Sequence, residues 1–490
     1  MAKQKGKTNT KAKDSGFLNP QIRPRKLPRY VIAELRHDSQ VSFAPSGFDG
    51  PTAVKRTYDN MNRILEDFKV KRVESHFEMR ESQIRLRSTA APTSLKQSVD
   101  ADFAQAGFVR IMPRSAKDVD PLTKRLKRSK AVWNAVVAPE PVPAAAPTGT
   151  STFSRNFEPC QGYLHSAPSG IAAMEAWIKF NARGKGITIC DIEGNWNFKH
   201  EDLPTLGHIG GTLINDLGWK NHGTAVVGEM VSKPSRSGTV GISHRARVYV
   251  QSAMVGGIFN ASAAITNATK KLNKGDVILI ELHAPSPRTG KYIAMQYWND
   301  VFSAIRVAVA KGITVVEAAG NGNENFNQRI YNGSGLQKDS GAIVVGAGIP
   351  PTNHMDYFGN DWSSLGFDRY SQIGVPRSRI FFSNYGKIVN VQAWGWHVTS
   401  TGYGDAQGGT NQNRWYTHRF SGTSSASPIV TGAAACIQGQ AMVKRGAPLD
   451  PKDVRDILIK TGTPQEPGPG VPLSQHIGPQ PNLLKALAKV

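Results

Sequence analysis

The chain has 490 residues, a formal net charge of +23 and a hydrophobic fraction of 39 %. This length and composition allow a large buried core and two or three domains, and they exclude a chain that is disordered throughout. Three cysteines are too few for a disulfide framework, and no apolar run is long enough to cross a membrane, so we expect no membrane partner.

Residues 1–28 predict a basic, disordered tail. The tail is polar and lacks the apolar core of a secretory signal, so we expect a cytoplasmic location, and export by another route stays open. About +13 of the net charge falls within residues 1–150. Neither a recognised motif nor interleaved aromatic residues accompany this charge, so a nucleic-acid partner is not expected.

Residues 29–139 predict a small α+β domain. The expected elements are a strand at 30–35, a helix at 52–68, an extended segment at 73–86, a strand at 108–112, a helix at 121–129 and a strand at 132–137. The order β-α-β-β-α-β is that of a ferredoxin-like fold. Residues 140–160 then predict a linker, because a Pro/Ala-rich run cannot stay helical and favours extended backbone.

Two apolar runs further along the chain end in polar residues. Residues 186–191 read as a buried strand that ends in Asp191, and residues 312–321 read as another that ends in Asn321. Sites of open α/β sheets lie at the carboxyl ends of parallel strands, so both side chains are candidates for a site. Glu193 stands past the expected strand end, where a solvated loop carboxylate is typical, and Asp191 is therefore the preferred acid.

A histidine and a serine are each expected at the start of a helix. His222 opens a run of small residues, and Ser424 precedes the apolar run 429–435. The N-terminus of a helix presents N–H groups and the positive end of its dipole, which stabilises negative charge developing on a nucleophile or its substrate. Ser427 precedes Pro428, and we expect it to set the start of the helix.

The chain order Asp191, His222, Asn321 and Ser424 resembles that of the subtilisin-like serine proteases, the subtilases. The resemblance runs from about residue 161 to the C-terminus. Further matches are the motif Gly-Thr-Ser-Ser-Ala-Ser-Pro at 422–428 and the segments 200–203, 342–347, 382–386 and 482–484. The resemblance implies a three-layer α/β catalytic domain with a mostly parallel central sheet over residues 161–490.

The activity that the resemblance implies is that of a serine endopeptidase acting on protein or peptide substrates. Ser424 would attack the peptide carbonyl, His222 would transfer the proton, and Asp191 would orient His222. The Asn321 amide and the Ser424 N–H would hold the oxyanion; losing such an amide costs subtilisin about 10²–10³-fold in turnover. The chemistry needs no cofactor and no metal, so none is predicted, and a structural calcium ion is left open.

The chain departs from the family pattern at three places, one of which is a set of extra loops between Asn321 and Ser424. Ile192 follows Asp191 where the family usually has a hydroxyl residue. The edge strand that binds substrate usually reads Ser-Leu-Gly-Gly, and the chain has Glu281, Leu282 and His283 there. By resemblance the substrate-binding set is Glu281, Leu282, His283, Ala319 and Gly320. Because His283 replaces a glycine, we expect a narrowed pocket and a preference for small side chains before the scissile bond.

The predicted domain at 29–139 is similar to the inhibitory propeptide of subtilases. In that family the propeptide assists folding, packs on the enzyme and leaves its C-terminal tail in the active site. The resemblance therefore implies a zymogen whose own N-terminal prodomain is a partner, and we expect self-cleavage within residues 144–146.

Two other functions remain open. The altered edge at Glu281–His283 and the residue Ile192 are compatible with a pseudoprotease that binds peptides without turnover. The basic N-terminal region is compatible with a module that tethers a protease to nucleic acid, and steep salt dependence of binding would favour this alternative.

Overall fold

The computed structural model of the chain describes residues 29–36, 41–44, 47–49, 52–75, 108–138, 154–351 and 375–490. The predicted tail at 1–28 and the predicted cleavage segment at 144–146 lie outside these residues. Within them, none of the helices is long and apolar enough to span a membrane.

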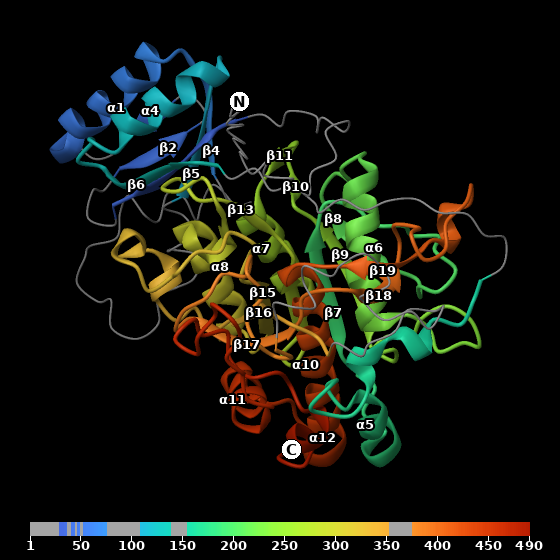
Figure 1. Cartoon of the computed structure of the whole chain (residues 1–490). Helices are drawn as coiled ribbons and strands as arrows, with labels where there is room; N and C mark the ends of the chain where they lie inside the picture. Colours follow the sequence, from blue (N-terminus) through green and yellow to red (C-terminus); the bar gives the residue numbers. More distant parts are fainter. Residues whose placement is uncertain are drawn as a thin grey trace, which may run out of the picture.

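A seven-stranded sheet forms the centre of the larger domain (Figure 1). Its strands are β7 (Thr188–Glu193), β8 (Gly207–Gly210), β9 (Arg247–Ser252), β12 (Val277–Ile280), β15 (Thr314–Ala318), β16 (Ile343–Gly348) and β17 (Val389–Trp394). They lie in the order β17-β16-β15-β12-β7-β9-β8, and all six pairings between neighbours are parallel. The predicted α/β class and parallel sheet are confirmed.

Helices cover both faces of this sheet. They are α5 (Ala173–Phe180), α6 (Leu217–Val231), α7 (Ala261–Lys271), α8 (Asn299–Ala310), α10 (Thr423–Arg445), α11 (Pro451–Thr461) and α12 (Leu483–Leu487). The helices α6 and α10 share a core with Ile189 and Leu279 of the sheet, whereas α7 and α8 share one with Ile192 and Ile280. Since successive side chains of a strand point to opposite faces, the two sets define the outer layers.

Central strands carry apolar residues on both faces because both faces are covered. All four residues of β12 are buried, and so are all six of β7, including Asp191 and Glu193. The two carboxyl groups are thus placed inside the protein by the sheet itself, which makes their partners decisive.

Short elements complete the larger domain. The strands are β10 (Met254–Val255), β11 (Ile258–Phe259), β13 (His283–Pro285), β14 (Tyr292–Ala294), β18 (Val398–Thr401) and β19 (Tyr416–Phe420). The 3₁₀ turns are Glu158–Cys160, Gly162–Leu164, Met295–Tyr297, Arg329–Tyr331, Gly335–Gln337 and Gln412–Arg414. Phe157 is buried against Tyr416, so the end of the predicted linker at 140–160 is part of the packed domain.

In the described residues, the N-terminal domain is a four-stranded antiparallel sheet with two α-helices. Its elements are β1 (Val31–Leu35), β2 (Ser42–Ala44), β3 (Gly47–Asp49), the 3₁₀ turn Thr52–Val54, α1 (Lys55–Asp67), β4 (Val70–Ser75), β5 (Phe108–Pro113), the 3₁₀ turn Ala116–Asp118, α4 (Val119–Leu126) and β6 (Val132–Val137). The strand order β4-β5-β1-β6 is the one expected for a ferredoxin-like unit. The hairpin of β2 and β3 was not expected.

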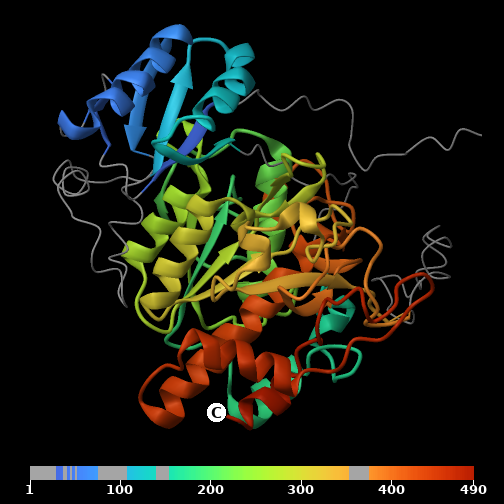
Figure 2. The ribbon, with the colours of Figure 1, turned by 90° about the vertical axis from the view of Figure 1, so that its left-hand side faces the viewer.

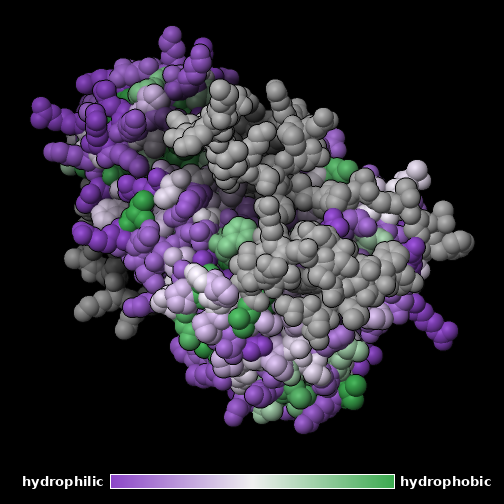
Figure 3. Space-filling model, in the orientation of Figure 1, coloured by the Kyte–Doolittle hydropathy of each residue, from purple (hydrophilic) through white to green (hydrophobic). Residues whose placement is uncertain are grey.

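The N-terminal domain packs on the larger domain through one face of its sheet (Figure 2). Tyr30, Ile32 and Phe108 belong to the same buried core as α7 and α8. The Tyr30 hydroxyl donates to the carbonyl of Phe259, and the Asn299 amide donates to Glu34 at 2.9 Å. On the side drawn in Figure 3, the rest of the domain is largely hydrophilic.

Candidate active site

His222 lies in the second turn of α6 and is almost fully buried. The helix begins earlier than expected because Asp216 caps it, accepting a hydrogen bond from the Trp219 N–H at 2.9 Å. A hydrogen bond joins Nδ1 of the His222 ring to Oε1 of Glu193. The ring also packs nearly perpendicular to that of Phe420, with 5.3 Å between ring centroids. With Nδ1 engaged, Nε2 is the nitrogen left for proton transfer.

The expectation that Asp191 orients His222 is wrong. Asp191 Oδ2 accepts a hydrogen bond from Trp196 Nε1 at 2.7 Å, and its Oδ1 has no partner among the described residues. Glu193 is not a solvated loop residue, because β7 continues to it and leaves it fully buried. Its second oxygen accepts from the Gly194 N–H at 3.4 Å.

The two-residue period of the strand explains why Glu193, and not Asp191, contacts His222. Side chains two residues apart share a face, so Asp191 and Glu193 both point toward α6. Glu193 stands closer to the carboxyl end of β7 and is one methylene longer, and these two properties let it reach His222. The alternation was visible in the sequence, but the place where α6 crosses the strand was not.

Ser424 is the second residue of α10 and is nearly buried. Gly422, which precedes the helix, has φ +111°, a conformation that residues with a Cβ rarely adopt. The Ser424 N–H is among the first N–H groups of the helix, which have no partner within it. No direct hydrogen bond joins His222 to Ser424 in the described part of the chain.

The start of α10 differs from the expectation. The helix begins at Thr423, so Ser427 does not set its start and lies inside it, with Pro428 after it. Ser427 is fully buried, and its hydroxyl contacts the Glu281 carboxyl. The tight turn at Gly422 starts the helix before the serine-rich segment ends.

Asn321 is joined to the N-terminus of α10. Its Oδ1 accepts from the Thr423 N–H at 2.9 Å and from the Thr423 hydroxyl at 3.0 Å. The Thr423 hydroxyl oxygen in turn accepts from the Gly320 N–H at 3.1 Å. These contacts leave the Asn321 amide N–H groups as donors beside Ser424, as an oxyanion site requires.

The predicted substrate-binding residues do not form one open strand. Glu281 and Leu282 are each 2 % exposed, and the Glu281 side chain is directed into the core beside α10. His283 begins β13, which pairs with β14, and its ring stacks on Tyr292 with centroids 4.5 Å apart. Ala319 and Gly320 are also buried. Glu281 is therefore not placed to line a substrate groove.

Four acidic side chains are buried where α6 and α10 pack on the sheet: Asp191, Glu193 and Glu281 on the side of the sheet, and Glu229 on α6. Burial raises the pKa of each well above its usual value, because ionised carboxyls are poorly solvated there. Burial also lowers the pKa of His222 to about 3, which keeps its imidazole uncharged at neutral pH. An uncharged imidazole is the form that can accept a proton.

His200 does not belong to this site. It lies in a turn, where its N–H donates to the carbonyl of Asn197 at 3.1 Å, and it is buried, with Nε2 2.8 Å from the carbonyl of Trp415. Burial lowers the pKa of His200 to about 4. Across the described residues, His, Cys, Asp and Glu form no group of three or more that could hold a metal ion.

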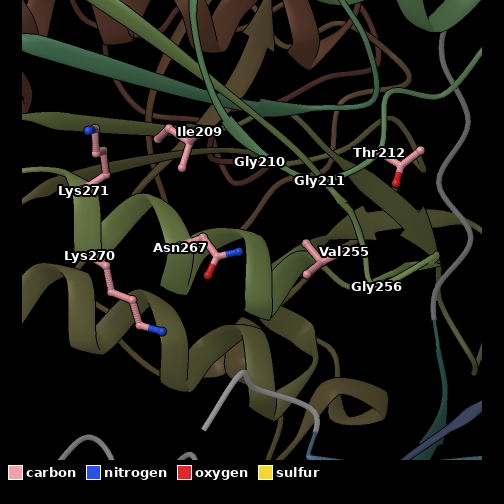
Figure 4. A pocket seen from close by; sticks show the side chains of 9 residues that line it. All are labelled: Ile209, Gly210, Gly211, Thr212, Val255, Gly256, Asn267, Lys270 and Lys271. Atoms are coloured by element: carbon pink, nitrogen blue, oxygen red, sulfur yellow. The ribbon is translucent and has the colours of Figure 1, made fainter.

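A separate pocket of about 610 Å³ lies beside α7 (Figure 4). Its lining includes Asn267, Lys270 and Lys271 from α7 and Gly210 and Gly211 at the end of β8. It contains none of the residues predicted for catalysis or substrate binding, so it is distinct from the site at His222.

Comparisons with known proteins identify the family of the chain. A model of the subtilase family matches residues 185–478. The subtilisin-like serine protease Pen ch 18 of Penicillium rubens is 27 % identical over 301 residues, which are 57 % of this chain and 50 % of that protein. Subtilisin DY of Bacillus licheniformis is 28 % identical over 306 residues, which are 61 % of this chain and 92 % of that protein.

Solved structures show the same fold. Fervidolysin from Fervidobacterium pennivorans, a keratinolytic enzyme related to subtilisin, superposes with a TM-score of 0.51 at 16 % identity, over 94 % of this chain and 61 % of that one. The chain spans about half the length of the first curated relatives that it matches.

Proposed function

Because the chain belongs to the subtilase family, we propose that it is a serine endopeptidase whose catalytic residues are Glu193, His222 and Ser424. The observation that carries the proposal is the hydrogen bond between Glu193 and His222, on the helix that packs beside α10 and its Ser424. A buried acid–imidazole pair next to a hydroxyl at a helix N-terminus is an arrangement suited to acyl transfer.

The reaction proceeds in two halves. The Ser424 hydroxyl oxygen attacks the peptide carbonyl carbon while His222 Nε2 takes the hydroxyl proton, and Glu193 accepts the Nδ1–H bond and stabilises the imidazolium. The oxyanion is held by the Asn321 amide and the Ser424 N–H. His222 then gives the proton to the leaving amine, and water hydrolyses the acyl-enzyme by the same route.

The N-terminal domain is proposed to be a prodomain. Its ferredoxin-like order and its contacts at Tyr30 and Glu34 with the larger domain support this role. Residues 29–139 would then be released by cleavage in the linker at 140–160.

The test is labelling of the purified protein with a fluorophosphonate, which reacts only with an activated serine, alongside hydrolysis of a fluorogenic protein substrate. We expect labelling at Ser424 that is lost in S424A and H222A, with hydrolysis lost in parallel. Peptide binding without labelling or hydrolysis would contradict the proposal and favour the pseudoprotease alternative.

A further inference from the structure

Glu281 is a buried carboxyl group that the mechanism above does not use. It follows β12, and its N–H donates to the carbonyl of Ile192 at 3.3 Å, so it continues the pairing of β12 with β7. The period of two places its side chain on the same face as Leu279, under α6 and α10. The result is a carboxyl group beside Glu193 and below the first turns of α10.

The contacts of Glu281 reach the helix that carries the nucleophile. Its Oε2 lies in a hydrogen bond with the Ser427 hydroxyl, whereas its Oε1 has no hydrogen-bond partner among the described residues. Ser424 lies three residues before Ser427 in the same helix. The Ser427 hydroxyl also lies 2.8 Å from the carbonyl of Thr423. A hydroxyl has one hydrogen, and the carbonyl can only accept. Both contacts of Ser427 are satisfied together when Glu281 carries a proton and donates it.

The surrounding charges keep that proton in place. Burial raises the pKa of Glu281 well above its usual value, the hydrogen bond with Ser427 opposes this, and the neighbouring carboxyls Glu193 and Asp191 on β7 raise it further. From α6, Glu229 faces the same group and His222 is uncharged. No positively charged side chain is among these neighbours. Ionised Glu281 would therefore be an additional buried negative charge without a counter-ion.

We propose that Glu281, in its protonated form, is a positioning residue that fixes the first turns of α10 through Ser427 and directs the Ser424 hydroxyl toward His222. The proposal rests on the proposed function. A neutral carboxyl donates to Ser427 and competes weakly for the Ser424 proton. A carboxylate is a strong acceptor, and it would draw the Ser424 hydrogen away from His222 Nε2. Ionisation of Glu281 therefore removes this positioning of the Ser424 hydroxyl.

The experiment compares wild type with E281Q and E281A by the rate of fluorophosphonate acylation and by kcat and KM on a fluorogenic peptide, from pH 5.5 to pH 10. Gln keeps the size and a donor but cannot ionise. We expect E281Q to stay within about threefold of wild type at pH 6.5 and to keep its activity at alkaline pH where wild type declines. We expect E281A to lose about tenfold in kcat, the worth of a hydrogen bond, with KM nearly unchanged.

The matched control is E317Q, since Glu317 is a buried glutamate of the adjacent strand β15 that accepts from the Gln296 N–H at 2.7 Å. It should behave as wild type in acylation. Thermal unfolding of each variant shows whether it is folded, and if E281A is not, the pH profile of E281Q decides.

Three results would overturn the inference. The first is that E281A is acylated as fast as wild type, and the second is that E281Q is acylated as slowly as E281A at pH 6.5. The third is that the activity of wild type and of E281Q declines equally at alkaline pH. Each of these three results can be interpreted only if the fluorophosphonate labels Ser424 of the wild type. Absence of that labelling would instead overturn the proposed function, so the two failures are distinct.

Discussion

The carboxyl group of Glu193 is hydrogen-bonded to Nδ1 of His222, whereas Asp191, two residues earlier on the same strand face, is hydrogen-bonded to Trp196. The two acids differ by one repeat of the strand and by one methylene. That difference decides which of them can hold the imidazole, and it gives a direct test of the site.

Replacing each acid by its amide should separate their roles. E193Q removes the acceptor that selects the Nδ1–H form of His222, and we expect kcat to fall by about 10³–10⁴-fold, as for other triads that lose this acid. D191N keeps an acceptor for the Trp196 N–H, and we expect a loss below about tenfold. Steady-state kinetics on one peptide provides the comparison. A larger loss for D191N than for E193Q would return the catalytic role to Asp191.

The pH dependence of activity should reflect the buried state of His222. Burial lowers its pKa to about 3, and a general base acts in its unprotonated form. A free histidine, with a pKa of about 6.5, is protonated below that pH. His222 in the folded protein stays unprotonated there, down to about pH 3. We expect kcat/KM to be maintained below pH 6.5 as the pH is lowered. An acid limb with a midpoint near pH 7 would contradict this expectation and show that the carboxylate of Glu193 outweighs burial in setting the His222 pKa.

Glu229 should make the protein less stable as the pH rises. Neither of its oxygens has a hydrogen-bond partner in the described residues, and burial raises its pKa. Between the unfolded pKa, near 4.5, and the higher folded value, the folded state holds a proton that the unfolded state has lost. The contribution of Glu229 to the free energy of unfolding is therefore most favourable below pH 4.5, and it is lost as the pH rises toward the folded pKa.

The substitution E229Q removes this titration. In an S424A background, which prevents self-digestion, we expect E229Q to gain about 1–3 kcal/mol over its parent at pH 8, because Gln needs no proton to be neutral in the folded state, and less at pH 5. Urea unfolding at both pH values measures the difference, with the exposed Glu66 as control in E66Q. An equal effect at the two pH values would rule out ionisation of Glu229 as the cause.

Cleavage specificity should follow from His283. Its ring is stacked on Tyr292 and occupies a position where the family usually has glycine. We expect small side chains before the scissile bond, and a broader preference in H283G, when a peptide library is profiled by mass spectrometry. A dominant preference of the wild type for Phe, Leu or Lys would contradict the narrowed pocket.

Maturation should depend on Ser424. We expect the intact mass of purified wild type to be reduced by the N-terminal domain, with a new N-terminus at or near residues 144–146, while S424A stays whole. A shortened S424A protein would point to host proteases. Two full-length proteins would mean that a trigger is absent or that the groove binds without cutting.

The sequence by itself determined the fold class and most of the elements. Apolar runs such as 186–191 read as buried strands because a parallel sheet is covered on both faces, and the small-residue runs around His222 and Ser424 read as helices. In the N-terminal domain, residue periodicity indicated the order of strands and helices, and the structure supplied their pairing. Local periodicity indicates the type of each of these elements because it shows which side of the helix or strand is buried.

Only the tertiary structure decided which acid contacts His222 and what Glu281 touches. Asp191, Glu193 and Glu281 all point to the face that α6 and α10 cover, so periodicity could not rank them. Their roles depend on where α6 crosses β7 and where α10 begins after Gly422. Those positions are set by packing between segments far apart in the chain, as in the contact of Glu281 with Ser427, and no local pattern encodes them.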